Sequence, residues 1–351
     1  MLKRHILEGS LVEREADCRL VSRFLSNKKR DPIKLLEAKL GAPFLSYRKR
    51  WEAALQKAAK FPIHVDYELM GKCNLKCPIC PMSMEAPLGK VIGEMSSTLS
   101  VSKVKELIDE GCKMGQGAMG FGGLWEPLLS PHLEELISYG RQKGLVDIMF
   151  NTNGNLLTAQ RAKTLIDSGL TRIMVSLDAY TQKTYKLMRP GGDLERVEEN
   201  ILKFLDLKGK KVLPLVRLSF CLTSLNEHEL YPFLKRWEEK VDFFSVQYYG
   251  NFSSKDKGIF PKEPLGPPPP LGFCDQPFRR VLVRHNGTVL PCCDLSSMDQ
   301  IVGNVHEESL FSIWQGSKIN KIRDSFTPKV DFELLSPSCR HCQEKYSTYD
   351  L

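Results

Sequence analysis

Several features that define whole classes of proteins are missing from this sequence of 351 residues. No uninterrupted apolar run approaches the roughly 18 residues of a transmembrane helix, and the first residues lack the apolar core of a signal peptide. We therefore expect a cytoplasmic protein without a membrane partner. There is no internal repeat, and a charged fraction of 26% beside a hydrophobic fraction of 42% excludes disordered, collagenous and fibrous chains. The length predicts one large globular domain joined to a smaller one.

Charge and cysteine are both unevenly distributed. Residues 1–60 hold 15 Lys and Arg against 7 Asp and Glu, which accounts for the whole formal net charge of +8. We interpret them as a basic helical extension packed on the next domain. Binding to nucleic acid or to an anionic carrier is the less favoured alternative, because few aromatic residues accompany the basic runs. The 11 cysteines are an odd number, which in a cytoplasmic chain indicates metal or redox chemistry rather than disulfides.

From residue 61 the chain alternates predicted strands with predicted helices. The strands are expected at 63–69, 118–122, 147–151, 172–176, 215–222 and 243–247, and the helices at 101–111, 131–143, 157–168, 193–207 and 227–239. Six strands separated by helices predict an α/β domain over residues 61–250, with a curved or closed parallel sheet. Residues 251–273 are a proline-rich linker. Residues 274–351 form a small α+β domain with a hairpin at Asn286-Gly287 and short helices near 310–315 and 319–326.

The first cysteine cluster directly follows the first predicted strand. Cys73, Cys77 and Cys80 are spaced C-x3-C-x2-C, and three thiolates can bind three irons of a [4Fe–4S] cluster and leave the fourth iron open. A zinc site with a distant fourth ligand is the alternative, although zinc ribbons pair C-x2-C units instead. The triplet resembles that of the radical S-adenosylmethionine (radical SAM) superfamily. The resemblance implies a partial (βα)6 TIM-like barrel over residues 61–250, with S-adenosylmethionine bound at the open iron.

Other segments match the same superfamily in order along the chain. The resemblance implies that the backbone of a glycine pair and a nearby glutamate meet the methionine amino group. It also implies that a Ser-x-Asp segment meets the ribose and carboxylate, and that an arginine pairs with the carboxylate. These residues are Gly122, Gly123, Glu126, Ser176, Asp178 and Arg189. The Glu is displaced from the glycines by an inserted Leu-Trp, which departs from the family pattern. Asn153, after the third strand, is either a cofactor contact or a turn residue.

A second cysteine set lies near the end of the chain. Cys274, Cys292, Cys339 and Cys342 can complete one closed site, and their arrangement resembles the Twitch domain, the shortened form of the SPASM domain. The resemblance implies one auxiliary [4Fe–4S] cluster. Tetrahedral zinc is the alternative, since four cysteines suit it equally well. Either Cys292 or Cys293 could be the ligand, and the spacing from the hairpin glycine favours Cys292.

The resemblance implies the first chemical step and leaves the substrate open. We expect reductive cleavage of S-adenosylmethionine and hydrogen abstraction from a small polyhydroxylated molecule such as a sugar, an aminocyclitol or a nucleoside. An electron donor such as flavodoxin or ferredoxin would be a partner. Dehydrogenation would pass an electron to the auxiliary cluster. Epimerisation would return hydrogen from a thiol, for which Cys221 and Cys293 are the candidates. The alternatives are a maturase of a ribosomally made peptide and a non-enzymatic zinc- or RNA-binding protein.

Two further polar sets alternate along predicted strands. His64, Asp66 and Glu68 share one face of the first strand, and Ser245, Gln247 and Tyr249 share one face of the sixth. Each set is either a group of substrate contacts or polar packing inside the barrel.

Overall fold

The structure of the chain is a computed structural model. The residues that it describes are 11–14, 22–27, 30–54, 57–80, 97–249, 274–292, 300–326, 330–331 and 333–344. The predicted proline-rich linker, Cys18 and Cys293 lie outside these ranges. Within them, no helix is long and apolar enough to cross a membrane.

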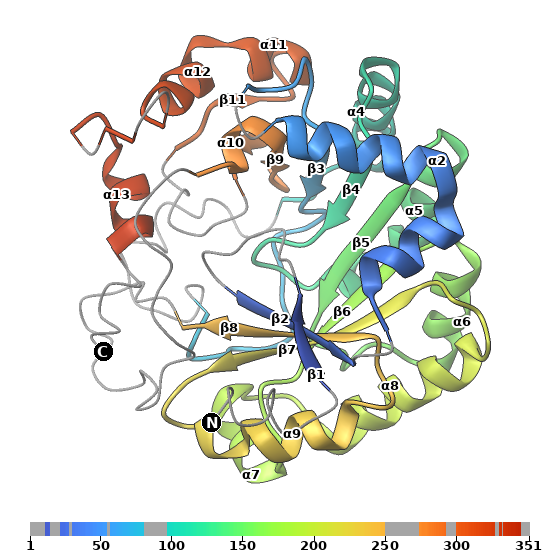
Figure 1. Cartoon of the computed structure of the whole chain (residues 1–351). Coiled ribbons are helices and arrows are strands. Elements are labelled where there is room, and N and C mark those ends of the chain that lie inside the picture. The colour runs from blue at the N-terminus through green and yellow to red at the C-terminus, as the bar shows by residue number, and fades with distance from the viewer. Residues whose placement is uncertain are drawn as a thin grey trace.

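Six parallel strands with helices between them form the centre of the molecule (Figure 1). The strands are β3 (His64–Tyr67), β4 (Ala118–Phe121), β5 (Asp147–Thr152), β6 (Arg172–Ser176), β7 (Leu215–Leu222) and β8 (Phe243–Tyr248). The connecting helices are α4 (Val101–Met114), α5 (Leu133–Gln142), α6 (Ala159–Asp167), α7 (Gln182–Met188), α8 (Leu194–Lys208) and α9 (Leu230–Trp237), with short 3-10 turns η2 (Pro127–Leu129) and η3 (Glu227–Glu229). The predicted α/β architecture is confirmed.

Each strand has one apolar face and one mixed face. In β6, Ile173 and Val175 belong to the main hydrophobic core, which also contains side chains of the surrounding helices. Met174 and Ser176 lie on the opposite face, as alternation in a strand requires. The register pairs Met174 with Arg217 and Ser176 with Ser219, so the second face of neighbouring strands is continuous. We call the six parallel strands with their helices the half barrel, and this second face its lumen.

The N-terminal part differs from the prediction. Residues 1–60 are not helical throughout, because β1 (Leu11–Arg14) and β2 (Ser22–Asn27) form an antiparallel hairpin. Strand β2 pairs antiparallel with β8 and so continues the sheet beyond the sixth parallel strand. The expected helix follows as α2 (Pro32–Ala53), which Asp31 caps by accepting hydrogen bonds from the first backbone N–H groups. Its path bends at Gly41, whose φ of 64° is outside the helical region.

Helix α2 packs against the end of the half barrel at which the parallel strands begin. Two side chains of this helix, Tyr47 and Trp51, are buried in an apolar cluster. The cluster also contains Ile63, Ala118 and Leu215, which lie at or next to the starts of strands. The amino-terminal end of the lumen is therefore filled by aromatic side chains. The open end is the one at which the parallel strands finish, where sites in this type of sheet are found.

The C-terminal part is joined to the barrel through the sheet itself. Strand β9 (Arg280–Val283) pairs parallel with β3, and β10 (Thr288–Leu290) and β11 (Gly303–Asn304) follow it antiparallel. All described strands thus belong to one 11-stranded sheet in the order β1-β2-β8-β7-β6-β5-β4-β3-β9-β10-β11. The predicted hairpin at Asn286-Gly287 is confirmed as the β9–β10 turn. Helices α10 (Gln276–Arg279), α11 (Leu310–Gln315), α12 (Ser317–Asp324) and α13 (Pro337–Glu344) complete this part.

Candidate active site

The three cysteines of the first cluster lie on the loop that follows β3, at the open end of the half barrel. Cys73 is exposed, and Cys77 and Cys80 are half-buried. The loop is held from the side, because Asn153 Nδ2 donates a hydrogen bond of 2.8 Å to Asn74 Oδ1. This bond ties the cysteine loop to the turn after β5, so Asn153 has at least a positioning role within the protein.

The environment of these thiols fits an iron–sulfur cluster. Burial raises the pKa of Cys73 and Cys77, and the guanidinium of Arg189 acts in the opposite direction on both. Arg189 Nη1 lies 3.9 Å from Cys77 Sγ. Among the described residues, no three His, Cys, Asp or Glu side chains stand close enough to hold one metal ion. A cubane does not require that, because each of its irons takes its own thiolate.

A buried ion pair stands beside the cysteine loop. Asp178, just after β6, pairs with Arg189, and their side chains are 1% and 11% exposed. Asp178 has a φ of 59°, and its Oδ1 accepts a hydrogen bond of 2.7 Å from the backbone N–H of Cys221. The Nε of Arg189 is buried and has no hydrogen-bond partner within the described residues. The structure therefore brings Asp178 and Arg189 together, and Ser176 is half-buried at the carboxyl end of β6.

Glu126 connects two loops of the site through hydrogen bonds. The residue is 3% exposed, and its carboxylate accepts hydrogen bonds from Thr152 Oγ1 at 2.6 Å, from the N–H of Asn153 at 2.8 Å and from the N–H of Leu128 at 3.1 Å. Its own N–H donates to the carbonyl of Lys72 at 3.1 Å. Burial raises the pKa of this carboxyl group, and these donors oppose the shift. Glu126 thus fastens the turn after β5 to the cysteine loop.

The glycine pair forms a bare stretch of backbone next to Glu126. Gly122 faces open space with only Asn151 nearby, and Gly123 has a φ of 106°. A Cβ at Gly123 would lie 2.3 Å from Glu68 Oε1, so no larger residue fits without a shift. Glu68 Oε1 also accepts a hydrogen bond of 3.0 Å from the N–H of Leu124. The open space at Gly122 fits the predicted backbone contact with a ligand, whereas the space beside Gly123 is taken by Glu68.

Cys221 is the thiol that the structure places on the lumen face. It lies in β7, one layer above Ser219, and its Cα partner in β8 is Gln247. Burial raises its pKa well above that of an ordinary thiol, and the nearby Asp178 carboxylate adds to the shift. The group therefore stays protonated at neutral pH. The other candidate, Cys293, lies outside the described residues.

The upper lumen is lined by hydroxyl groups. Ser176, Ser219 and Ser245 are Cα partners across β6, β7 and β8. Ser245 Oγ is buried without a hydrogen-bond partner among the described residues. Tyr249, which the sequence grouped with Ser245, is buried beyond the end of β8.

The carboxylates of β3 are already paired inside the protein. Asp66 binds His64 at 3.0 Å and also pairs with Arg280, and Glu68 lies 3.4 Å from Arg284 Nε. Against the cost of burial, the charges of Arg280 and His64 hold the pKa of Asp66 below its usual range. This set is polar packing within the lumen, and the alternative of open substrate contacts is not supported. The sequence signal was the even spacing of Arg280, in β9, and Arg284, just after it, but the pairing of β9 with β3 was not foreseen.

The second cysteine set converges from three segments. Cys274 precedes α10, Cys292 follows β10, and Cys339 and Cys342 are three residues apart on α13. Burial raises the pKa of Cys274, and Cys292 and Cys342 are close enough to add to the shift. Cys274 and Cys339 pack against the same apolar cluster of Phe278, Phe326 and Leu335. Gln300 Nε2 lies 3.4 Å from Cys339 Sγ. A group of four half-buried thiols drawn from three segments fits a cluster site.

Asn226 is an important residue of the site that sequence reasoning missed. It is fully buried, and its Nδ2 donates to the carbonyls of Asp178 at 2.8 Å and of Cys221 at 2.9 Å. Its Oδ1 accepts from the N–H of Thr223 at 2.8 Å. The available signal was a Thr-x-x-Asn turn at the end of a strand. Asn226 locks the two strand ends that carry Asp178 and Cys221.

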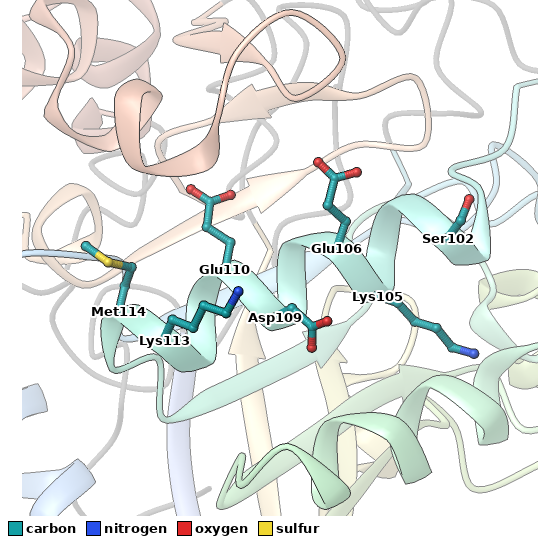
Figure 2. Close-up of a pocket in the computed structure, with 7 residues that line it drawn as sticks. All are labelled: Ser102, Lys105, Glu106, Asp109, Glu110, Lys113 and Met114. Carbon is teal, nitrogen blue, oxygen red and sulfur yellow. The ribbon is translucent and has the colours of Figure 1, made fainter.

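A surface groove elsewhere does not belong to this site. It follows one face of α4, as Figure 2 shows, and is lined by Ser102, Lys105, Glu106, Asp109, Glu110, Lys113 and Met114. Glu110 accepts hydrogen bonds from the N–H groups of Leu310 and Phe311 at the start of α11. The groove therefore runs beside the contact between the barrel and the C-terminal part, and none of its lining residues belongs to the cysteine sites.

Comparison with protein families gives two matches. The model of the radical SAM superfamily matches residues 67–236, and that of an iron–sulfur cluster-binding domain, SPASM, matches residues 274–343. The first range contains the cysteine triplet and the Asp178–Arg189 pair. The second contains all four cysteines of the C-terminal set.

Curated relatives match part of the chain. A probable GTP 3',8-cyclase of Methanococcus maripaludis is 33% identical over 136 residues, which are 39% of this chain and 43% of that protein. A GTP 3',8-cyclase of Limosilactobacillus fermentum is 28% identical over 193 residues, 54% of this chain and 55% of that protein. The chain thus spans about half the length of the curated relatives that it matches.

Solved structures resemble the whole fold at low sequence identity. Streptococcus suis SuiB bound to S-adenosylmethionine has a TM-score of 0.62 and 15% identity, over 90% of this chain and 89% of that one. The protein anSMEcpe with bound AdoMet and the Cp18Cys peptide has a TM-score of 0.54 and 16% identity, over 74% of this chain and 82% of that one. At these identities the likeness establishes the fold.

Proposed function

The chain belongs to the radical SAM superfamily and carries a C-terminal SPASM domain, with S-adenosylmethionine and [4Fe–4S] clusters as its cofactors. From that premise we propose that it abstracts hydrogen from a small polyhydroxylated substrate held in the lumen of the half barrel. The observation that carries the proposal is the position of Cys221. It adjoins the Asp178–Arg189 pair beside the cysteine loop and stands one layer above a row of lumen hydroxyl groups.

Cys73, Cys77 and Cys80 would hold the cluster that binds S-adenosylmethionine. Cys274, Cys292, Cys339 and Cys342 would hold one auxiliary cluster. When bound and reduced, the first centre supplies one-electron cleavage of S-adenosylmethionine to methionine and a 5'-deoxyadenosyl radical. The electron would come from a small donor protein such as flavodoxin or ferredoxin.

The protein's own residues orient the cofactor. The backbone at Gly122 suits the methionine amino group, because Asn151 is the one side chain of the described residues near it and Gly123 adds no side chain of its own. Arg189 offers a buried Nε that is free of protein partners within the described residues, and a guanidinium is a strong donor to a carboxylate. Asp178 fixes that guanidinium, and Ser176 is available to the ribose. Glu126 and Asn153 maintain the loops around them.

The lumen favours a hydroxyl-rich substrate. Ser176, Ser219 and Ser245 present side chains that both donate and accept hydrogen bonds, which suits sugars, aminocyclitols and nucleosides. Curated relatives are named for action on GTP, a ribose-containing molecule. This agrees with the proposed substrate class.

Cys221 favours epimerisation over dehydrogenation. Its raised pKa keeps the thiol protonated, and an S–H group can return a hydrogen atom to a substrate radical. In that step the substrate carbon gains the hydrogen atom, and the sulfur is left as a thiyl radical. Restoring the Cys221 thiol would take one electron, which the cluster held by the four C-terminal cysteines would pass on from the donor protein, and one proton from solvent. In dehydrogenation the substrate radical would instead lose a proton and pass its electron to that cluster.

The first experiment tests the cofactor assignment. Anaerobic reconstitution should give about eight irons and eight sulfides per chain, as two cubanes imply. Reduced protein with S-adenosylmethionine should then release 5'-deoxyadenosine. Cys77→Ala should abolish that release, whereas Cys112→Ala on α4 should retain it. Stoichiometric zinc without sulfide, or full release from Cys77→Ala, would contradict the proposal.

The second experiment tests the fate of the substrate radical. Reactions in deuterium oxide would contain GTP, nucleoside-diphosphate sugars or aminocyclitols, and products would be analysed by mass spectrometry. Epimerisation predicts one solvent deuterium in the product, which is lost in Cys221→Ser and kept in Cys112→Ser. A product two electrons more oxidised and without deuterium would establish dehydrogenation instead. If only a peptide were modified in a parallel reaction, the small-molecule proposal would be wrong.

A further inference from the structure

A buried ion pair links the C-terminal domain to the glycine segment of the barrel. Glu68 follows β3 and Arg284 follows β9, and their side chains are 0% and 1% exposed. Arg284 Nε lies 3.4 Å from Glu68 Oε2. The backbone joins the same two segments, because the N–H of Glu68 donates to the carbonyl of Val283 at 2.9 Å. Glu68 is thus held by the C-terminal domain through both its backbone and its side chain.

The other oxygen of the same carboxylate reaches the glycine segment. Glu68 Oε1 accepts a hydrogen bond of 3.0 Å from the N–H of Leu124. It also fills the space beside Gly123, where a Cβ would come within 2.3 Å of it. The backbone conformation at Gly123 is left-handed, with a φ of 106°, and the carboxylate contacts both it and the next residue. One carboxylate oxygen of Glu68 therefore contacts the C-terminal domain, and the other contacts the glycine segment of the barrel.

We propose that Arg284 and Glu68 are positioning residues through which the SPASM domain sets the backbone of Gly122–Leu124 for S-adenosylmethionine. This inference rests on the proposed function, because it assumes that the glycine segment meets the cofactor. Arg284 fixes where the carboxylate stands, and the carboxylate fixes the Leu124 N–H and the turn at Gly123. Without Arg284 the carboxylate would be a buried charge lacking its cation. It would shift or take up a proton, and the glycine segment would lose its fixed support.

A second buried pair in the same half barrel provides a matched control. Asp147 and Arg172 pair across β5 and β6, with side chains 0% and 8% exposed. This pair has a similar burial and the same kind of groups. It lies near the start of the strands, at the opposite end from the cysteine loop, and both of its residues stand on barrel strands, Asp147 on β5 and Arg172 on β6. Breaking it should lower stability without disturbing the glycine segment.

The test measures cofactor affinity separately from catalysis. Full-length Arg284→Met, Arg284→Lys and Arg172→Met would be reconstituted anaerobically, and their iron content and thermal unfolding would be compared with those of the parent. The dissociation constant of S-adenosylmethionine would be measured by equilibrium dialysis. Its effect on the electron paramagnetic resonance of the reduced cluster would be recorded in parallel.

We expect Arg284→Met to bind S-adenosylmethionine at least tenfold more weakly at unchanged iron content, and to show a spectrum closer to the cofactor-free form. Arg284→Lys, which keeps the charge, should return to within about threefold of the parent. Arg172→Met should lose comparable stability but keep its affinity within twofold. Unchanged affinity in Arg284→Met, or an equal loss in Arg172→Met, would overturn the inference. If Arg284→Met does not fold, the uncharged polar variant Arg284→Gln takes its place: affinity within twofold of the parent overturns the inference, and a larger loss supports it.

This result is distinguishable from failure of the proposed function. If the parent protein with full iron content neither binds nor cleaves S-adenosylmethionine, the proposed function fails. If the parent binds it and the Arg284 variants bind it equally well, only the positioning inference fails.

Discussion

Replacing Asn226 with alanine should damage both stability and the site. The Asn226 side chain joins three backbone groups, donating to the carbonyls of Asp178 and Cys221 and accepting from the N–H of Thr223. Alanine removes these three bonds, and with them the 3.0 Å bond that Oδ1 accepts from Thr223 Oγ1, and offers no replacement. Because Asn226 is 0% exposed, water does not reach the freed groups without opening the strand ends.

The expected loss follows from these contacts. A buried hydrogen bond contributes about 1 kcal/mol net, and a group left unsatisfied costs about 1–3 kcal/mol. Three lost bonds therefore predict a decrease of at least about 3 kcal/mol in the free energy of unfolding. That is a large share of the roughly 5–15 kcal/mol by which a typical domain is stable. The freed Asp178 should also hold Arg189 less firmly, so the affinity for S-adenosylmethionine should fall.

The assay is urea unfolding of the cluster-free protein, followed by circular dichroism, together with cofactor binding to the reconstituted protein. Asn200→Ala is the matched control, because Asn200 makes a single partly buried bond of 2.9 Å to the carbonyl of Gly154. It should cost about 1 kcal/mol and leave cofactor affinity unchanged. The reasoning is refuted if Asn226→Ala is no less stable than Asn200→Ala, or if it binds S-adenosylmethionine as tightly as the parent.

Three further changes have definite expected results. Trp51→Ala should lower the free energy of unfolding by about 3–5 kcal/mol in urea titrations, since the ring is 3% exposed within an apolar cluster; a loss below about 1 kcal/mol would contradict the packing. Gly123→Ala should lower the unfolding temperature and weaken S-adenosylmethionine binding. Gly144→Ala, with a similar φ but open space, should show only the strain. Asp66→Asn should make the free energy of unfolding fall less steeply as the pH is lowered. The pKa of Asp66 is lower in the folded than in the unfolded protein, so its carboxylate stabilises the fold fully above about pH 4. That stabilisation is lost progressively as the pH falls from there toward the folded-state pKa. Parallel urea titrations of parent and variant from pH 6 to pH 3 measure this, and parallel curves would disprove it.

The parallel strands were predictable because their signal is local. Alternation along 172–176 and 215–222 gave strand bounds that agree with β6 and β7, since one face of each strand packs on helices and the other lines the lumen. The hairpin at Asn286-Gly287 was equally visible, because that dipeptide suits its tight turn. The cysteine spacings led to the family, which the comparisons confirm.

The missed features depend on partners far along the chain. Strand β2 has the sequence Ser-Arg-Phe-Leu-Ser-Asn, which is weak in strand-forming residues, and its conformation comes from pairing with β8. The pairing of Asp66 with Arg280 and of Glu68 with Arg284 requires that β9 lie beside β3. Nothing near those acids indicates that neighbour. For Asn226, the sequence shows a turn, while its contact with Asp178 is set by how two strands end side by side.

The place of β9 in the sheet has a consequence for how the protein is made. Asp66 and Arg280 are 214 residues apart, so at about 5–20 residues per second the ribosome supplies β9 roughly 10–40 s after β3. During that interval one edge of β3 can pair with β4, but the strand that pairs with its other edge, β9, has not yet been made. The cysteine loop begins at the end of that same strand. Loading of the first cluster into the finished site should therefore follow completion of the chain rather than accompany its synthesis, and a nascent chain arrested before β9 should expose an edge that is prone to aggregation.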